Sequence, residues 1–297
     1  MARWFVGVAA FLLSMHAFTS LFAGTTAFRD LAYVRNGSAE QRLDLVLPAA
    51  PSPDRPAVPV ILWLHGGGWE HGSRQQNPAA AMTARGYAVA SVDYRLSSQA
   101  KYPAQIEDCR AAVRWLRAHA AEYGLDPARI GVWGASAGGH LAALLGTAAA
   151  EKSFEVGEHL DQSSAVQCVI DSFGPSDLLH WGDPPLPAYL DAPDTAVARL
   201  LGGRVRDHID KARLASPVTF VDRHSAPFLI MHGANDPIVP VQQSVVLDAA
   251  LRRAGVESTL VVIPGGGHGG PAFAQGSYLA QMAAFMDRHL LRAPAGR

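Results

Sequence analysis

Short apolar runs recur along the chain, and most of them end in a glycine or a turn. They lie at 59–64, 87–92, 129–133, 165–171, 226–231 and 258–263. Such runs, without polar alternation, are typical of strands buried on both faces of a parallel sheet. Helical spacing appears between them, at 77–85, 102–121, 141–150, 241–254 and 278–291. Strands that alternate with helices predict an α/β fold, with a mostly parallel, twisted sheet covered by helices on both faces.

Two stretches depart from this rhythm. Residues 31–47 alternate between apolar and polar positions and predict a pair of edge strands. Residues 178–216 contain Pro184, Pro185, Pro187 and Pro193 among short helical pieces. We expect residues 28–297 to form a single domain in which the stretch at about 178–216 is a lid-like excursion over the sheet edge, able to roof a pocket.

The first residues predict export. A basic residue near the start is followed by an apolar run at 4–13, too short to span a bilayer but suited to a signal peptide. We predict a signal peptide at 1–27, cleaved after Ala27, with Ala23 as a poorer cleavage site. The protein is then periplasmic or secreted and has no stable membrane association. An uncleaved membrane anchor at 4–23 is the alternative.

Composition excludes some classes of function. The chain has 297 residues, 49% of them hydrophobic, which is enough for one large core. Lys and Arg number 25 against 26 Asp and Glu with no basic stripe, so we expect no nucleic-acid partner. The 12 histidines show no paired spacing that suits a metal. Cys109 and Cys168 fall in helical and strand patterns and are expected as core residues, with a disulfide between them as the alternative.

Gly134-Ala-Ser136-Ala-Gly138 joins a predicted strand to a predicted helix. The motif is weak alone in a chain with 28 glycines, and its position gives it weight. A serine on a sharp strand-to-helix turn exposes its hydroxyl at the carboxyl end of a sheet. Gly134 and Gly138 stand where the two backbones must nearly touch, and the helix start supplies N–H groups to a developing oxyanion. We therefore predict Ser136 as a nucleophile.

A second glycine-rich turn, His65-Gly-Gly-Gly68-Trp69, follows the apolar run at 59–64. Consecutive glycines leave backbone N–H groups uncovered by side chains, as an oxyanion requires. A merely flexible turn is the alternative.

Ser136, Asp236 and His268 each follow a predicted strand, in the order that a nucleophile on such a turn requires. A serine hydroxyl needs an imidazole to take its proton, and the imidazole needs a carboxylate to fix its tautomer. Asp177 also follows a strand and is the alternative acid, but it precedes the excursion, and we favour Asp236.

The remaining polar residues of these turns are predicted to be structural. His65 is expected to anchor the glycine turn, His140 to point along the helix after Ser136, and His232 to pack at a strand end. Asp93 and Asp108 are expected as structural polar groups.

Taken together, the motifs resemble those of the α/β-hydrolase superfamily, most closely small carboxylesterases of the feruloyl/acetyl-xylan esterase-like and hormone-sensitive-lipase-like groups. The resemblance covers about 33–291 and rests on His65-Gly-Gly-Gly-Trp69, Asp93-Tyr-Arg95, Gly134-Ala-Ser-Ala-Gly-Gly139, His232-Gly-x-x-Asp236 and Gly267-His268. Hormone-sensitive-lipase-like members usually carry a helical cap before the His-Gly-Gly-Gly turn. The mature chain has too few residues there, which favours the capless feruloyl-esterase-like group.

The resemblance implies a triad of Ser136, Asp236 and His268 and an oxyanion hole formed by the N–H groups of Gly67, Gly68 and Ala137. It implies a serine carboxylesterase that hydrolyses short-chain acyl or aryl esters through an acyl-enzyme, with a small-molecule ester as its partner and no cofactor or metal. An arylformamidase-like amidase or a peptidase with the same triad is the alternative, and a non-enzymatic binding module is disfavoured. The sequence carries no indication of the oligomeric state.

Overall fold

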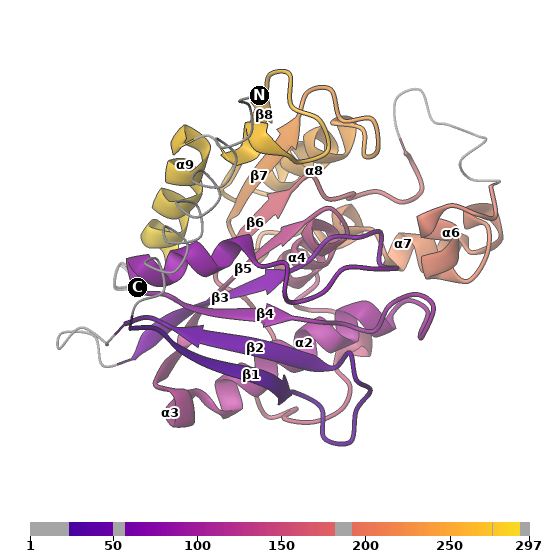
Figure 1. Cartoon of the computed structure of the whole chain (residues 1–297). Helices are drawn as coiled ribbons and strands as arrows, with labels where there is room; N and C mark the ends of the chain where they lie inside the picture. The colour runs from indigo at the N-terminus through magenta and orange to yellow at the C-terminus, as the bar shows by residue number, and fades with distance from the viewer. Residues whose placement is uncertain (1–23, 50–56, 182–191, 275, 292–297) are drawn as a thin grey trace, which may run out of the picture.

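The computed structural model describes residues 24–49, 57–181, 192–274 and 276–291. Within them an eight-stranded sheet has the order β1-β2-β4-β3-β5-β6-β7-β8 (Figure 1). The strands are β1 (Thr26–Ala32), β2 (Arg42–Leu47), β3 (Val58–Leu64), β4 (Ala88–Val92), β5 (Leu125–Ala135), β6 (Val169–Ser172), β7 (Phe228–Gly233) and β8 (Ser258–Ile263). β2 runs antiparallel to both β1 and β4, and the remaining neighbours are parallel. The predicted mostly parallel sheet with an antiparallel edge pair is confirmed.

Most strands lie where the apolar runs predict them, and β3 is buried along its whole length. β6 is shorter than the predicted 165–171. The Gln167 side chain accepts the N–H of Ile130 at 2.8 Å, so a side-chain oxygen replaces a main-chain acceptor just before the ladder begins. The regular strand therefore starts at Val169.

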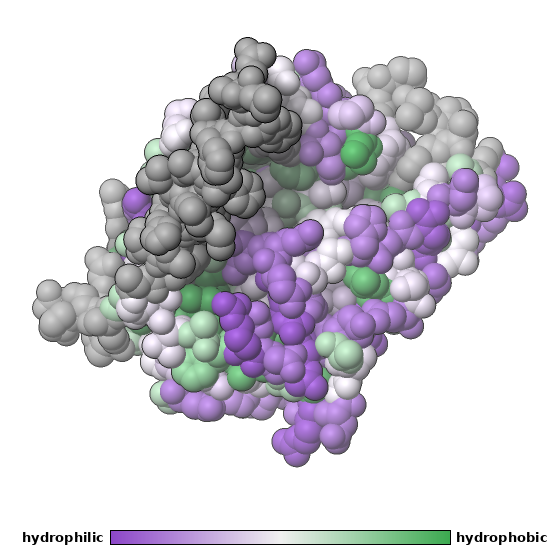
Figure 2. Space-filling view, viewed as in Figure 1, coloured by the Kyte–Doolittle hydropathy of each residue, from purple (hydrophilic) through white to green (hydrophobic). Residues whose placement is uncertain are grey.

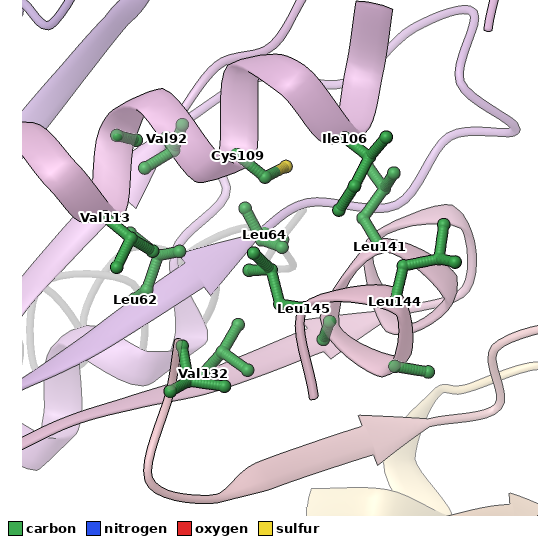
Figure 3. Packing of buried hydrophobic residues seen from close by; sticks show 14 of the residues in the cluster. Leu62, Leu64, Val92, Ile106, Cys109, Val113, Val132, Leu141, Leu144 and Leu145 are labelled. Atoms are coloured by element: carbon green, nitrogen blue, oxygen red, sulfur yellow. The ribbon is translucent and has the colours of Figure 1, made fainter. Parts of the chain in front are cut away.

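Helices cover both faces of the sheet. On one face lie α2 (Ala104–Ala118), α3 (Ala120–Tyr123), α4 (Ala137–Thr147) and α8 (Gln242–Arg253). On the other lie the 3₁₀ helix η1 (Pro78–Arg85), α9 (Gly276–Met286) and the π-helical η6 (Asp287–Leu291). Figure 3 shows side chains of α2 and α4 meeting those of β3 and β5. The single helix predicted at 102–121 is divided at His119.

The two cysteines are buried and free, and they lie in the separate cores on the two faces of the sheet. Alternate residues of β3 show this division, with Leu62 in the core around Cys109 and Trp63 in the core around Cys168. The prediction that both are core residues is confirmed, and no disulfide joins them.

The stretch predicted as an excursion contains α6 (Ala196–Leu201), η3 (Val205–Asp207) and α7 (Ile209–Leu214), followed by η4 (Pro217–Phe220). In Figure 1, α6 and α7 stand beyond the carboxyl ends of the parallel strands. Pro184, Pro185 and Pro187 lie outside the described residues. Two short 3₁₀ helices, η2 (Lys152–Phe154) and η5 (Pro271–Ala274), complete the connections.

The predicted signal peptide and the alternative anchor fall mainly on residues 1–23, outside the described residues. Thr26 and Ala27 are the first residues of β1 and pair with Leu47 and Val46. Among the described helices, none has the length and apolar character that a membrane crossing requires. Over the described part of the face in Figure 2, hydrophobic side chains appear singly or in small groups between hydrophilic ones.

Candidate active site

Ser136 occupies the turn between β5 and α4. Its backbone has φ 55° and ψ −120°, in a region that residues with a Cβ rarely adopt. The turn is tight because Gly134 and Gly138 are in contact, and a Cβ on Gly134 would collide with the carbonyl oxygen of Gly138. A Cβ on Gly138 would collide with the carbonyl oxygen of Leu64 on the neighbouring strand. The glycines therefore permit the strained turn that exposes the serine.

His268 joins Ser136 to Asp236. Its Nε2 lies 2.8 Å from the Ser136 Oγ, and its Nδ1 lies 2.7 Å from the Asp236 Oδ2. An ionised carboxylate only accepts, so Nδ1 carries the proton and Nε2 keeps a lone pair for the serine hydroxyl. The rings of Phe173 and His268 pack edge to face, with 4.8 Å between their centroids. The structure thus brings the three predicted residues into one hydrogen-bonded chain.

Asp236 is surrounded by hydrogen-bond donors. Its Oδ1 accepts the backbone N–H groups of Ile238 and Val239 at 2.8 and 2.9 Å. Its Oδ2 accepts from His268 and lies 3.2 Å from the Nε2 of His232. Burial alone would raise the pKa of Asp236, but the hydrogen bonds from the two histidines and the two amides outweigh it and hold the pKa well below its ordinary value. The carboxylate is therefore held ionised and in a fixed orientation.

Asp177, the alternative acid, serves a different purpose. Its Oδ2 lies 2.8 Å from the Nδ1 of His180, and its Oδ1 accepts the backbone N–H groups of Leu179 and His180. These contacts close a local turn after β6. The structure does not join Asp177 to His268.

The glycine turn after β3 lies beside the serine, because β3 and β5 are neighbours and Leu64 pairs with Gly134. Gly67 has φ 113° and Gly68 has φ 61°, conformations that glycine adopts most readily. Among the described residues, no hydrogen-bond acceptor is found for the N–H groups of Gly67, Gly68 or Ala137. The three predicted oxyanion donors are therefore close to Ser136 and uncommitted.

Residues of the segment after β4 support this turn. The His65 ring stacks on Tyr94 with 4.4 Å between centroids, and the Tyr94 hydroxyl donates to the His65 carbonyl at 2.9 Å. The Ser97 N–H donates to the Trp69 carbonyl at 2.7 Å. His65 is buried, and burial lowers its pKa. The expected anchoring role of His65 agrees with these contacts.

A pocket of about 280 Å³ opens over the serine. Its floor includes Gly68, Trp69, Ser136 and Ala137, and its remaining walls are mostly apolar, formed by Pro175, Trp181, Ala196, Val197, Ile238 and Val239. Trp181, Ala196 and Val197 belong to the stretch predicted as a roof. The nucleophile therefore faces a small apolar pocket that this stretch partly encloses.

Two histidines that the sequence predicts as structural contact the site. His232 is fully buried, donates from Nε2 to the Val239 carbonyl at 2.8 Å, and also faces Asp236. His140 is fully buried and accepts from the Trp69 indole at 3.2 Å. The sequence contains one signal for these contacts, the spacing: each histidine lies four residues from a predicted catalytic residue.

Asp171 is a buried carboxyl group beneath the site. Its Oδ1 accepts the Gly174 N–H at 2.9 Å, and its Oδ2 has no partner within the described residues. Burial raises its pKa to about 6, against the opposing effects of the Gly174 hydrogen bond and the nearby His232. In the ranges that the structure describes, no cluster of three or more His, Cys, Asp or Glu side chains could hold a metal ion.

Known proteins are similar to this chain in sequence and in fold. A family model described as BD-FAE matches residues 43–251. The chain belongs to the BD-FAE family. Its predicted resemblance to α/β-hydrolase carboxylesterases is confirmed by its relatives. The esterase LipC of Mycobacterium tuberculosis is 33% identical over 221 residues, which is 73% of this chain and 54% of LipC.

Two solved structures extend the comparison. A truncated carbohydrate esterase from gut microbiota has a TM-score of 0.81 and 32% identity, covering 90% of this chain and 97% of that one. A thermophilic esterase of Thermogutta terrifontis has a TM-score of 0.70 and 28% identity, covering 92% of this chain and 95% of that one. The chain spans about half the length of the curated relatives it matches.

Proposed function

We propose that the protein is a serine carboxylesterase that hydrolyses short-chain acyl esters through an acyl-enzyme intermediate. The observation that carries the proposal is the continuous chain of hydrogen bonds from the Ser136 hydroxyl through His268 to Asp236. Ser136, at the end of this chain, lines the apolar pocket. The names of the relatives, esterases and carboxylic ester hydrolases, support it.

In the proposed reaction Ser136 attacks the ester carbonyl while the Nε2 of His268 takes its proton. The same nitrogen then gives this proton to the leaving alkoxide, and the acyl group stays on the serine oxygen. Water deprotonated by the Nε2 of His268 next attacks the acyl carbonyl. The bond from this carbonyl to the Ser136 oxygen then breaks, Nε2 returns the proton to the serine oxygen, and the carboxylic acid is released. Throughout, Asp236 holds the Nδ1 proton and stabilises the imidazolium.

The negative charge on the carbonyl oxygen needs donors that are already in place. The N–H groups of Gly67, Gly68 and Ala137 have the required freedom and proximity, and we assign them to the oxyanion hole. Removal of one such donor in other enzymes slows the reaction by about 10²–10³-fold. A preformed hole therefore accounts for a substantial part of the expected rate enhancement.

The size of the pocket favours a short acyl group. A volume of about 280 Å³ lies at the small end of the range for ligand pockets. The Thermogutta terrifontis esterase was solved with butyrate bound and phosphorylated by paraoxon. Those complexes support a short acyl group and a phosphorylatable nucleophile for this chain.

The test uses p-nitrophenyl acetate and a fluorophosphonate probe. Ser136→Ala is expected to lower kcat/KM by about 10⁴-fold or more and to abolish labelling, because the nucleophile is removed. Ser153→Ala, at an exposed position in η2, is the matched control and should retain both activity and labelling. Labelling that persists in Ser136→Ala would show that the nucleophile lies elsewhere. Faster turnover of N-formylkynurenine than of any ester would replace the proposed esterase with an amidase.

A further inference from the structure

His140 lies between the oxyanion turn and the roof of the pocket. On one side its Nδ1 accepts the indole N–H of Trp69 at 3.2 Å, and the two rings meet edge to face at 5.1 Å. On the other side its Nε2 lies 2.6 Å from the carbonyl oxygen of Ala215. Its own backbone belongs to α4, one turn after Ser136. One imidazole thus connects three segments that are distant in sequence.

The two partners fix the state of the ring. A carbonyl oxygen only accepts, so Nε2 carries a proton, and the Trp69 indole only donates, so Nδ1 carries a lone pair. His140 is therefore neutral and in a single tautomer. Its burial agrees with this state, since burial lowers its pKa to about 4.

Trp69 has a conformation that requires support. Its φ is 60°, in the left-handed region that bulky residues rarely adopt. Its carbonyl accepts from Ser97, and its side chain is held by His140. Trp69 directly follows Gly67 and Gly68 in the same turn, so the positions of these glycines are coupled to that of Trp69. It also lines the pocket over Ser136.

Ala215 is the C-cap of α7 and lies within the stretch that roofs the pocket. A second contact joins the same parts, since the Arg199 guanidinium on α6 pairs with the Glu70 carboxylate just after Trp69. The oxyanion turn and the roof are therefore connected through a buried histidine and an exposed ion pair.

We propose that His140 is a positioning residue. It holds Trp69, and with Trp69 the oxyanion donors, in a fixed position relative to the roof of the pocket. The inference rests on the proposed esterase function. It goes beyond that function because His140 touches neither the substrate nor the reacting atoms. Its effect is expected on transition-state stabilisation, because misplacing catalytic donors by about 1 Å costs about 10²-fold in rate.

Two substitutions separate the two hydrogen bonds. His140→Asn keeps an acceptor near the Nδ1 position and loses the donor to Ala215. His140→Gln keeps a donor near the Nε2 position and loses the acceptor for Trp69. With p-nitrophenyl butyrate, we expect His140→Gln to lower kcat by about 10–100-fold with KM within about twofold, and His140→Asn to retain at least about fivefold more kcat than His140→Gln.

A transition-state analogue provides the readout that a purely structural role would not change. The inhibition constant of a short alkyl trifluoromethyl ketone should rise in His140→Gln in parallel with the loss of kcat. Trp69→Phe removes the other end of the same hydrogen bond and is expected to lower kcat similarly. The double variant should then be no slower than the slower single variant, because both changes remove one interaction.

His119→Gln is the matched control. His119 is half-buried at the end of α2, stacks on Trp115 at 4.2 Å between centroids, and has its Nδ1 2.9 Å from the Trp115 carbonyl. It should retain the wild-type kcat and inhibition constant. Equal kcat for His140→Gln and wild type, additive losses in the double variant, or lost kcat with an unchanged inhibition constant would each overturn the role of His140. An inactive wild-type protein would instead refute the esterase proposal, so the two failures are distinguishable.

Discussion

Replacing Asp236 by asparagine should disable the Ser136–His268–Asp236 chain while the size and shape of the side chain stay nearly the same. The Oδ1 faces two backbone N–H groups, of Ile238 and Val239, which can only donate. The amide oxygen of the introduced asparagine must therefore take that side, and its NH₂ group must face His268. An imidazole can change its tautomer, whereas a backbone amide cannot. His268 is then expected to present its Nδ1 lone pair to the asparagine and its Nε2–H to Ser136.

In that tautomer Nε2 cannot accept the proton of the serine hydroxyl. The same substitution in another serine hydrolase lowers kcat by about 10⁴-fold, which corresponds to about 5 kcal/mol of transition-state stabilisation. We expect a loss of this size in kcat for Asp236→Asn. Asp177→Asn should change kcat by less than about threefold, because Asp177 binds His180 and local amides rather than His268.

The assay compares kcat and KM of both variants with wild type on p-nitrophenyl butyrate, with thermal midpoints from circular dichroism as the check on folding. KM of Asp236→Asn should remain near the wild-type value, since the pocket is unchanged. If a folded Asp236→Asn variant keeps more than about one tenth of the wild-type kcat, or if Asp177→Asn is the more damaging change, the tautomer argument is wrong.

Three further expectations concern stability, specificity and processing. The pKa of Asp171 in the folded protein, about 6, lies above its unfolded value of about 3.8. Ionisation of Asp171 as pH rises from about 4 to 6 therefore lowers the free energy of unfolding, by up to about 3 kcal/mol. Asp171→Asn should therefore raise the thermal midpoint more at pH 8 than at pH 5, and an equal change at both would refute the assignment. Across p-nitrophenyl acetate, butyrate, octanoate and palmitate, kcat/KM should rise about fourfold per methylene to butyrate and then level off or fall, whereas a maximum at octanoate or beyond would indicate a lipase-like channel. When the chain is expressed in a host that secretes it, N-terminal sequencing should find cleavage after Ala23, the site that the sequence ranks second. Cleavage after Ala27, the site that the sequence ranks first, would remove the first two residues of β1, and a mature chain that begins at Phe28 would contradict this reasoning.

The local chemistry of the site could be predicted from the sequence because it depends on neighbouring residues. Gly134, Ser136 and Gly138 predict a tight turn through sterics alone, and a buried apolar run before each motif predicts its place at the end of a strand. Chain order then favoured Asp236 over Asp177. These inferences require no knowledge of which strands are neighbours.

The roles of His140 and His232 could not be predicted in this way. The contact of His140 with Trp69 exists because β3 and β5 are adjacent in the sheet, and periodicity does not reveal strand order. The contact of His232 with Asp236 depends on how the turn after β7 closes, through the Val239 carbonyl and amide. A buried histidine without a visible partner in the sequence is therefore easily assigned to packing alone.

The position of His268 after β8 has a consequence for heat inactivation. In the part of the chain that the structure describes, β8 is an edge strand paired only with β7. Most of its residues are partly or fully exposed, whereas β3, inside the sheet, is buried throughout. Segments with few buried contacts open at lower free energy than the core. Detachment of β8 would withdraw the base while the nucleophile and the glycine turns stayed folded. Loss of hydrolysis on heating would then precede loss of the circular dichroism signal, and rapid cooling would restore it.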